Sequence, residues 1–331
     1  MIERTDRRQF LKGALAAAAT GAAASGARAQ AEAVDTLRML VGFPAGGTTD
    51  AVARRIADAL RPGYARSTVV ENKPGAGGRL AVEELKRSAA DGSVMLLTPA
   101  SMITLYPHLY ARLAYRPEDV QPVSTACTSV FGFGVGPAVP ASVRTLKQFV
   151  AWAKANPQGA HYGSPGAGTP PHFIGALLGK DAGVDLRHVP YRGSIPGVQE
   201  LLGGQLSAMS TPLGDFLPHV KAGKLRLLAT SGPQRSRFAP DVPTFAEEGL
   251  GDCTVVEWYG LMFPAGTSAA LTNRAAAAVR AAVATAEMGE AFAQFGLETA
   301  SSTPAALGQA ITAERARWAP IVKRVGFTPE A

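Results

Sequence analysis

The sequence predicts an α/β protein whose two similar halves face each other across a cleft. Three observations lead to this prediction. Short apolar runs alternate with helical patterns, which is typical of a parallel sheet covered by helices. The alternation occurs twice, once in each half of the chain. No low-complexity linker separates the halves, so short loops or ordinary strands must join them and bring them into contact.

The first half begins with a short buried strand at 37–43. A helix is predicted at 50–60, because Val52, Ile56 and Leu60 recur at helical spacing on one face. The remaining elements of this half are a strand at 68–70, a helix at 79–88, and a strand at 94–98 that follows Asp91-Gly92. This β-α-β-α-β order predicts parallel strands.

The second half repeats the pattern from residue 131 onward. Further strands are predicted at 131–135, 160–163, 187–190, 205–209, 225–230 and 254–263. Helices are predicted at 145–155, 170–179 and 195–202, and in the tail at 268–285, 287–295 and 304–325. The tail therefore contributes three helices in succession.

The first 29 residues have the pattern of a twin-arginine export signal. Arg7-Arg8 precede an alanine-rich stretch that ends in Ala27-Arg28-Ala29, an A-x-A cleavage site. The apolar run at 13–27 is shorter than the roughly 20 apolar residues of a spanning helix, so a retained membrane anchor is the less favoured alternative. We expect residues 1–29 to be cleaved and the mature chain to reside in the periplasm.

Charge and composition exclude several classes of protein. The net charge is +7, and residues 1–29 hold five basic and two acidic residues, which leaves +4 for the rest. The basic residues are scattered, so no nucleic acid partner is expected, and a mildly positive body suits small anions. The five histidines lack metal-ligand spacing, and no metal or cofactor is expected.

The two cysteines, Cys127 and Cys253, are far apart in the sequence. They could pair in an oxidising compartment, or they could be two buried free thiols in strands. The sequence leaves both alternatives open.

The strand at 37–43 leads into a glycine-containing loop, Pro44-Ala45-Gly46-Gly47-Thr48-Thr49-Asp50, and then into a helix. Adjacent glycines let backbone N–H groups face a ligand, and a helix N-terminus favours an anion. The alternative is a tight turn in which Thr49 or Asp50 caps the helix. The loop lacks the Gly-Lys-Ser/Thr of a P-loop and the G-x-G-x-x-G of a dinucleotide site.

A second loop of small residues, 164–172, occupies the equivalent place in the other half. Thr169 is a candidate N-cap, and the prolines after it suit a first helical turn. Two such loops, one in each half, suggest a clamp that holds an anion from both sides. Ser164 is not in a G-x-S-x-G elbow, and His172 has no carboxylate at helical spacing to orient it. We therefore expect no catalytic residue, and a hydrogen-bonding or packing role for His172.

Three further segments are weaker candidates. The loop 71–78 is rich in glycine, and a plain turn is the favoured interpretation. Ser101 follows a buried strand at the carboxyl end, where open α/β sheets bind ligands. Trp258-Tyr259-Gly260 is more typical of core or inter-lobe packing.

Taken in order, several motifs resemble one known family. They are 41–50, 72–78, 163–172, Val189-Pro190-Tyr191-Arg192-Gly193-Ser194, Leu201-Leu202-Gly203-Gly204-Gln205, 221–225 and Trp258-Tyr259-Gly260. The chain resembles the Bug-type receptors, the extracytoplasmic solute-binding components of tripartite tricarboxylate transporters. The resemblance covers essentially all of the mature chain.

The resemblance implies a two-lobed periplasmic binding protein, a type II-like clamshell with the ligand cleft between its lobes. Carried over by position, the ligand-binding residues are Phe43, Ala45, Gly46, Gly47, Asp50, Ser101, Gly163, Ser164, Thr169, His172 and Gly193. Thr211 stands where many members carry an Asp, which puts the distal pocket and the ligand's identity in doubt. Ala176 stands where many members carry a Glu.

We therefore expect lobe 1 to comprise 30–130 and 250–331, and lobe 2 to comprise 131–249. The expected function is a non-catalytic receptor that captures a small carboxylate for membrane permease subunits, acting as a monomer. Two alternatives stay open: a secreted hydrolase-like enzyme, and an orphan receptor that reports its ligand to a sensor.

Overall fold

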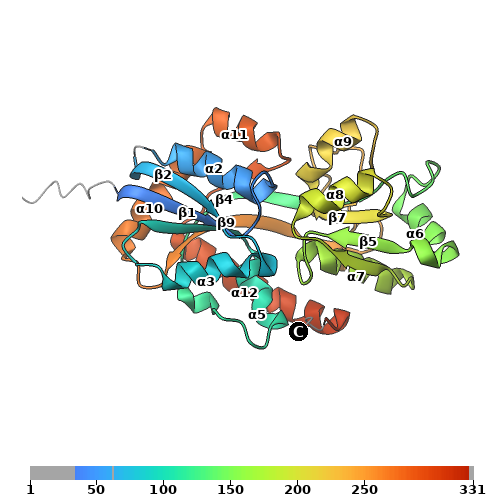
Figure 1. The fold of residues 1–331 in the computed structure, drawn as a ribbon, viewed down its shortest axis with the longest axis horizontal. Coiled ribbons are helices and arrows are strands. Elements are labelled where there is room, and N and C mark those ends of the chain that lie inside the picture. The colour runs from blue at the N-terminus through green and yellow to red at the C-terminus, as the bar shows by residue number, and fades with distance from the viewer. Residues whose placement is uncertain (1–33, 62, 328–331) are drawn as a thin grey trace, which may run out of the picture. The chain divides into compact units, whose positions relative to one another are not determined.

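The computed structural model describes residues 34–61 and 63–327 (Figure 1). The predicted twin-arginine signal peptide at 1–29 lies outside these residues. Within them, the strands follow one hydrogen-bonded path in the order β2-β1-β3-β9-β4-β7-β5-β6, and β10 and β8 also pair with β4. Strand β4 belongs to both halves of this path, so it joins the two halves into one ladder.

The first half of the path forms the sheet of lobe 1. Its strands are β2 (Ala65–Asn72), β1 (Val34–Val41), β3 (Val94–Pro99), β9 (Val256–Pro264), β10 (Glu298–Thr299) and the first part of β4 (Val120–Val135). Strands β1, β2 and β3 are parallel as predicted, whereas β9 pairs antiparallel with β3 on one side and with β4 on the other. The prediction missed this reversal because residue patterns do not encode strand direction.

The second half of the path forms the sheet of lobe 2. Its strands are β7 (Ala208–Pro212), β8 (Arg226–Thr230), β5 (His161–Ser164), β6 (Arg187–Pro190) and the end of β4. Strand β4 pairs with β9 as far as Val130 and with β7 from Phe131 onward. The lobe boundaries at 130/131 and 249/250 stay a prediction.

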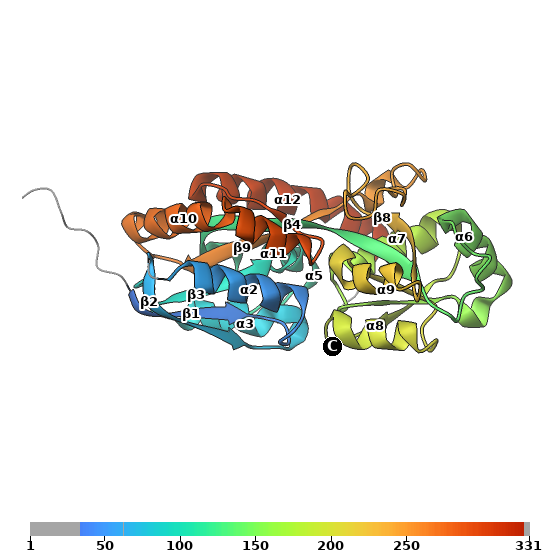
Figure 2. The same cartoon turned by 90° about the horizontal axis from the view of Figure 1, so that it is seen from above.

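Helices cover both faces of the lobe 1 sheet (Figures 1 and 2). On one face lie α2 (Thr48–Ala59), α10 (Ala269–Val283) and α11 (Ala286–Ala293); on the other lie α3 (Arg79–Arg87), α4 (Ser101–Thr104), α5 (Tyr106–Leu109) and α12 (Pro304–Val325). Neighbouring residues of a strand point to opposite faces. Met39 accordingly packs in the cluster of the first helix set, and Leu40 in that of the second.

The lobe 2 sheet is covered in the same way. Helices α6 (Leu146–Ala155) and α7 (Pro170–Ala182) contribute Phe149 and Phe173 to one apolar cluster. Helix α8 (Ser194–Leu202) contributes Val198 to a separate cluster, beside which α9 (Leu217–Lys221) packs. Short 3-10 turns lie at Ala76–Gly78, Pro117–Asp119, Pro157–Gly159, Leu213–Asp215 and Gly251–Cys253.

The long helices and most strands lie close to their predicted positions, but five elements differ. Strand β4 begins at Val120, eleven residues before the predicted start. The prediction missed this first part because it is rich in Ser and Thr and includes Pro122 at a register shift, so it lacks the apolar pattern of a strand. Strand β7 lies three residues later than predicted. The short helices α4, α5 and α9 were not predicted, since four or five residues are too few to display a helical period.

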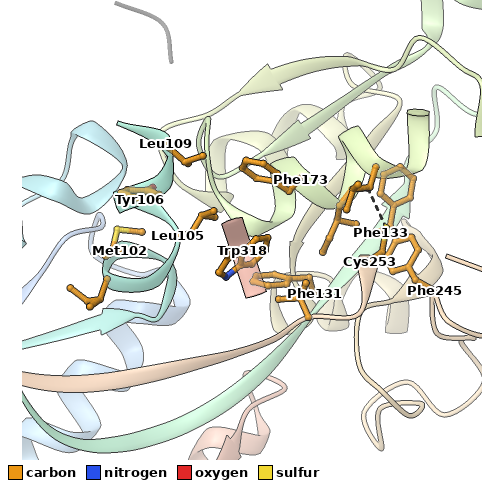
Figure 3. Close-up of a cluster of buried hydrophobic side chains, with 14 of the residues drawn as sticks. Met102, Leu105, Tyr106, Leu109, Phe131, Phe133, Phe173, Phe245, Cys253 and Trp318 are labelled. Carbon is orange, nitrogen blue, oxygen red and sulfur yellow. Dashed lines mark hydrogen bonds between the residues drawn. The ribbon is translucent and has the colours of Figure 1, made fainter. Parts of the chain in front are cut away.

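One apolar cluster continues from lobe 1 into lobe 2 (Figure 3). Trp318 of α12 lies at its middle, with its ring centroid 5.9 Å from that of Phe173 on α7. The Trp318 indole N–H also donates to the Glu314 carboxylate, which accepts a second hydrogen bond from the Trp258 indole on β9. The predicted lobe 1 tail therefore packs against lobe 2 as well.

Both cysteines are buried free thiols, so the second alternative is confirmed. Cys127 lies in β4 as expected, whereas Cys253 lies in a 3-10 turn rather than a strand. Burial raises the pKa of both thiols, that of Cys253 to about 12. Across residues 34–61 and 63–327, no helix combines the length and apolar character that crossing a membrane requires.

Candidate functional site

A cavity of about 260 Å³ lies between the two lobes. Strand ends and loops of both sheets line it. Five of the twelve predicted ligand-binding residues are among its lining: Phe43, Gly47, Ser101, Thr169 and Gly193. The other seven are not: Ala45, Gly46, Asp50, Gly163, Ser164, His172 and Thr211. The lining is mainly apolar, and seven prolines contribute to it: Pro44, Pro99, Pro165, Pro170, Pro171, Pro196 and Pro212.

The β1–α2 loop presents unpaired backbone donors to this cavity. Gly47 is the N-cap of α2 and makes no side-chain cap bond, so neither Thr49 nor Asp50 is the cap. Within the described part of the chain, the N–H groups of Gly47, Thr48 and Thr49 donate to no other residue, and all three residues line the cavity. The start of a helix carries a partial positive charge. This side of the cavity therefore has the geometry of an anion site.

Asp50 holds this loop in place from behind. Its Oδ2 accepts hydrogen bonds from the Gly46 N–H and from Arg54 Nε, both at 2.9 Å, and its Oδ1 accepts one from the Asn72 amide at 2.9 Å. Burial alone would raise the Asp50 pKa, but these hydrogen bonds outweigh burial and lower it. Gly46 has φ +87°, a conformation that favours glycine, and its N–H is already occupied.

The β5–α7 loop has a different chemistry. Thr169 occupies the N-cap position of α7 as predicted, but its hydroxyl donates to the Gly166 carbonyl at 2.7 Å and caps no helix N–H. Pro170 and Pro171 fill the next two positions, and proline has no backbone N–H. This helix start therefore offers the cavity an apolar surface.

Ser164 and His172 belong to a buried cluster behind that loop. The Ser164 hydroxyl lies within hydrogen-bonding distance of the Gly166 carbonyl, at 2.9 Å, and of His188 Nε2, at 2.7 Å. The His172 ring stacks on His188 at 3.8 Å, and its Nδ1 accepts the Gly168 N–H. Burial lowers the pKa of His172 to about 4 and that of His188 to about 3. His172 therefore packs against His188 in this structure, and a ligand contact at His172 stays a prediction.

Three other predicted residues lie outside the cavity lining. Gly163 and Thr211 pack against or hydrogen-bond to other residues of the protein, and Ala45 faces solvent. A side chain at Gly163 would collide with Leu206 and Tyr191, each 2.7 Å from the position of a Cβ. Thr211 is buried behind Pro212, and its hydroxyl lies 2.8 Å from both Asp215 Oδ2 and Ser194 Oγ. Ala45 is exposed.

The lobes touch directly beside the cavity. The Thr48 hydroxyl of lobe 1 donates to Asp215 Oδ1 of lobe 2 at 3.1 Å. A Cβ built on Gly193 would lie 3.6 Å from the Pro44 ring. Burial raises the Asp215 pKa, against the hydrogen bonds from Ser194, Thr211 and Thr48. The two lobes are therefore in direct contact at the edge of the cavity.

Several lining residues were not predicted from the sequence. Thr48 and Thr49 lie in the predicted loop but were not singled out, and Arg192 belongs to a motif used only for the resemblance. Glu257 is an acidic residue in the otherwise mostly apolar strand β9, a signal that could have found it. In the part of the chain that the structure describes, no cluster of His, Cys, Asp or Glu is suited to a metal ion.

Relatives of this chain match its sequence over most of its length. A protein in the gbd 5′ region of Cupriavidus necator is 35% identical over 88% of this chain and 89% of its own. BugT of Bordetella pertussis is 31% identical over 88% of this chain and 89% of its own.

Solved structures match in the same way. BugD, a periplasmic binding protein, has a TM-score of 0.82 at 28% identity, over 89% of this chain and 99% of its own. MatC of Rhodopseudomonas palustris with bound malate has a TM-score of 0.79 at 28% identity, over 87% and 99%. Rpa4515 of R. palustris with adipate has a TM-score of 0.84 at 26% identity, over 89% and 99%.

A family model, that of the tripartite tricarboxylate transporter family receptor, matches residues 52–327. This match extends from the helix that follows the donor-rich loop to the end of the described chain, and so includes both lobes. Together with the relatives, it shows that the chain belongs to the receptor family of tripartite tricarboxylate transporters.

Proposed function

We propose that this chain captures a small carboxylate in the periplasm and delivers it to the membrane permease subunits of a tripartite tricarboxylate-type transporter. The proposal includes export through the twin-arginine signal at 1–29, and action as a monomer. Malate and adipate in the related structures support a carboxylate as the ligand class.

One observation carries the proposal. The cavity between the lobes combines unpaired N–H groups at the start of α2 with walls that are mostly apolar. A carboxylate fits the first feature, because backbone donors and the helix dipole stabilise an anion without a buried cation. The volume, about 260 Å³, lies just below the roughly 300–1,000 Å³ common for small-molecule sites, which favours a small ligand.

A thermal-shift experiment on the purified mature chain tests the ligand class. The panel comprises malate, succinate, adipate, citrate, nicotinate and acidic amino acids, with neutral sugars as controls. A carboxylate that binds should stabilise the fold by about 2.7 kcal/mol at a hundredfold excess over its Kd. Stabilisation by sugars without any by carboxylates would contradict the proposal. Native mass spectrometry of the untreated protein would identify a carboxylate that co-purifies.

We also propose that the chain has no catalytic activity, although Ser164 and His188 are in hydrogen-bonding contact. The Ser164 hydroxyl also lies within hydrogen-bonding distance of the Gly166 carbonyl, and among the described residues no carboxylate hydrogen-bonds to His188 to orient it as a general base. Ser164 is also fully buried and outside the cavity lining. Hydrolysis of a simple ester that is lost in Ser164→Ala would support the enzyme alternative instead.

A further inference from the structure

Glu257 is the one acidic side chain that lines the cavity, as far as the described residues go. It lies in β9, two residues before Tyr259, so both side chains leave the strand on the same face, about 7 Å apart along the strand. Tyr259 also lines the cavity. Glu257 is only 3% exposed, so almost none of its surface reaches bulk water.

A backbone donor holds this carboxyl group, and no cation faces it. Its Oε1 accepts the Ser101 N–H at 3.2 Å, while the neighbouring Ala100 N–H donates to the Trp258 carbonyl at 2.9 Å. Among the described residues, no Lys or Arg forms an ion pair with Glu257. Arg192, the one basic residue of the cavity lining, is exposed and comes from the opposite lobe.

The other titratable neighbours do not favour a negative charge at Glu257. Glu314 of α12, whose carboxylate accepts a hydrogen bond from the Trp258 indole of β9, is a second acidic group near Glu257, and Tyr259 of β9 and Tyr106 of α5 are the remaining groups. Burial and, secondarily, Glu314 raise the pKa of Glu257 to about 8. The group is therefore mainly a neutral acid near pH 7.

We propose that Glu257 contacts the ligand as a neutral acid and donates its carboxyl proton to an oxygen of the bound carboxylate. This inference rests on the proposed function and assigns a residue that sets the charge preference of the site. An ionised Glu257 would repel a carboxylate inside so small a cavity, whereas the acid form gives a strong O–H···O⁻ hydrogen bond.

The surrounding walls narrow the ligand class further. Phe43, Met102, Phe131 and Ile195 line the cavity together with the prolines. Such walls stabilise the carbon skeleton of a ligand but give no partner to scattered hydroxyl groups. The favoured ligand is thus a carboxylate with an apolar body, held at the lobe 1 wall by the α2 N–H groups and the Glu257 acid.

The first experiment needs no ligand. Carbon-13 NMR of protein labelled at the glutamate side-chain carboxyl should reveal one carboxyl that titrates near pH 8 and is missing from Glu257→Gln. Glu248→Gln, a change at an exposed position, should leave that resonance in place. If every glutamate of the wild-type protein titrates below about pH 6, the acid state is excluded and the inference falls.

The second experiment measures calorimetric affinity for adipate, and for the other carboxylates of the panel, in three variants. Glu257→Gln keeps a neutral donor, so its affinity should stay within about threefold of wild type, whereas Glu257→Ala should lose at least tenfold. Wild-type affinity should fall about tenfold from pH 7 to pH 9 as the acid fraction falls, and Glu257→Gln should show no such fall. Glu248→Gln should follow wild type.

The outcomes separate the inference from the proposed function. Two results would mean that the ligand requires an ionised Glu257, as a ligand with a cationic group does. One is an equal loss of affinity in Glu257→Gln and Glu257→Ala, and the other is wild-type affinity that rises toward pH 9. Either result overturns the inference and leaves carboxylate binding intact. Failure of every carboxylate to bind the wild-type protein contradicts the proposed function, and the donor role with it.

Discussion

Two helix starts face the same cavity, one from each lobe, and they differ in a single chemical respect. At the start of α2, the N-cap Gly47 is followed by Thr48 and Thr49, whose N–H groups donate to no residue that the structure describes. At the start of α7, the N-cap Thr169 is followed by two prolines, 170 and 171, which have no N–H. The start of α2 can therefore donate hydrogen bonds to an anion, whereas the start of α7 offers the ligand only apolar contact.

This difference teaches how loops of similar composition can divide a binding task. Both loops are small-residue connections from a parallel strand to a helix, and both reach the cavity. Proline, like threonine, is compatible with the first positions of a helix, so the fold tolerates either residue there. The choice between them decides whether the helix dipole is exposed to the ligand as hydrogen-bond donors or covered by a ring.

Replacing Thr48 by proline should have the largest effect, because it gives α2 the chemistry of α7. Gly47 already has the extended backbone that precedes a proline, so the fold should accept the change. Loss of one donor to a charged oxygen should weaken carboxylate binding by about 1.5–3 kcal/mol, tenfold or more, in calorimetry. Thr48→Ala, which keeps the N–H and loses only the hydroxyl bond to Asp215, is the matched control. Equal affinities of Thr48→Pro and Thr48→Ala would mean that the residue 48 N–H does not bind the carboxylate.

Asp50→Asn should have the next largest effect, since Asp50 holds the donor-rich loop from behind. Its buried hydrogen bonds predict a loss of about 1–3 kcal/mol in unfolding free energy and a smaller loss of affinity. The folded pKa of Asp50 is lowered, so its contribution is present above the ordinary value of 3.8 and is lost as pH falls through the folded value. The gap between variant and wild type in chemical denaturation should therefore close in acid. Asp58→Asn, at an exposed position of α2, should open no comparable gap.

The histidine pair behind the second loop should affect stability more than binding. His172 and His188 have lowered folded pKa values, so below about pH 6.5 the unfolded chain binds protons that the folded chain does not. Stability should then fall toward pH 4, by up to about 1.4 kcal/mol per pH unit for each ring. His172→Gln should reduce this slope and change ligand affinity less than about threefold. His108→Gln, at an exposed position, should keep the full slope; a tenfold affinity loss in His172→Gln would return that residue to the site.

Pro170→Ala should have the smallest effect on carboxylate affinity, and it tests the start of α7 as Thr48→Pro tests the start of α2. It restores one N–H at the start of α7, and removing a proline from a compatible position should lower stability by about 0.4–1 kcal/mol. We expect carboxylate affinity within about twofold of wild type. A tenfold gain would show that the new N–H reaches the ligand, and that both helix starts can act as donors.

The sequence predicts an element well wherever the apolar residues of that element recur with helical or strand spacing. Helix α12 has the predicted bounds, and α2, α6 and α10 lie within two or three residues of theirs. The failures concern elements that depend on partners elsewhere in the chain. The first part of β4 is a strand because β9 and β10 flank it, not because its own residues alternate strongly.

The site is less predictable for the same reason. The resemblance and the loop pattern located the two helix starts, but not the roles of individual side chains. Asp50 was expected to bind the ligand; in the structure its carboxylate accepts hydrogen bonds from Gly46 and from Asn72, which is 22 residues away in the sequence, and a ligand contact of Asp50 stays a prediction. The cavity position of Glu257 depends on an antiparallel pairing that residue patterns do not reveal. The twelve-residue site as a whole stays a prediction until a ligand is identified.

The shared carboxylate of Glu314 gives the molecule a means of reporting its own movements. Two of the three tryptophans, Trp258 and Trp318, are hydrogen-bonded to it, and Trp318 also stacks edge-on with Phe173 of the other lobe. The third, Trp152, lies in α6 and stacks on Phe149 of the same helix, so this ring contact lies within lobe 2 alone. A rotation of the lobes alters the surroundings of two indoles and leaves the third as an internal reference. Intrinsic fluorescence thus serves as an optical readout of lobe closure that requires no added dye.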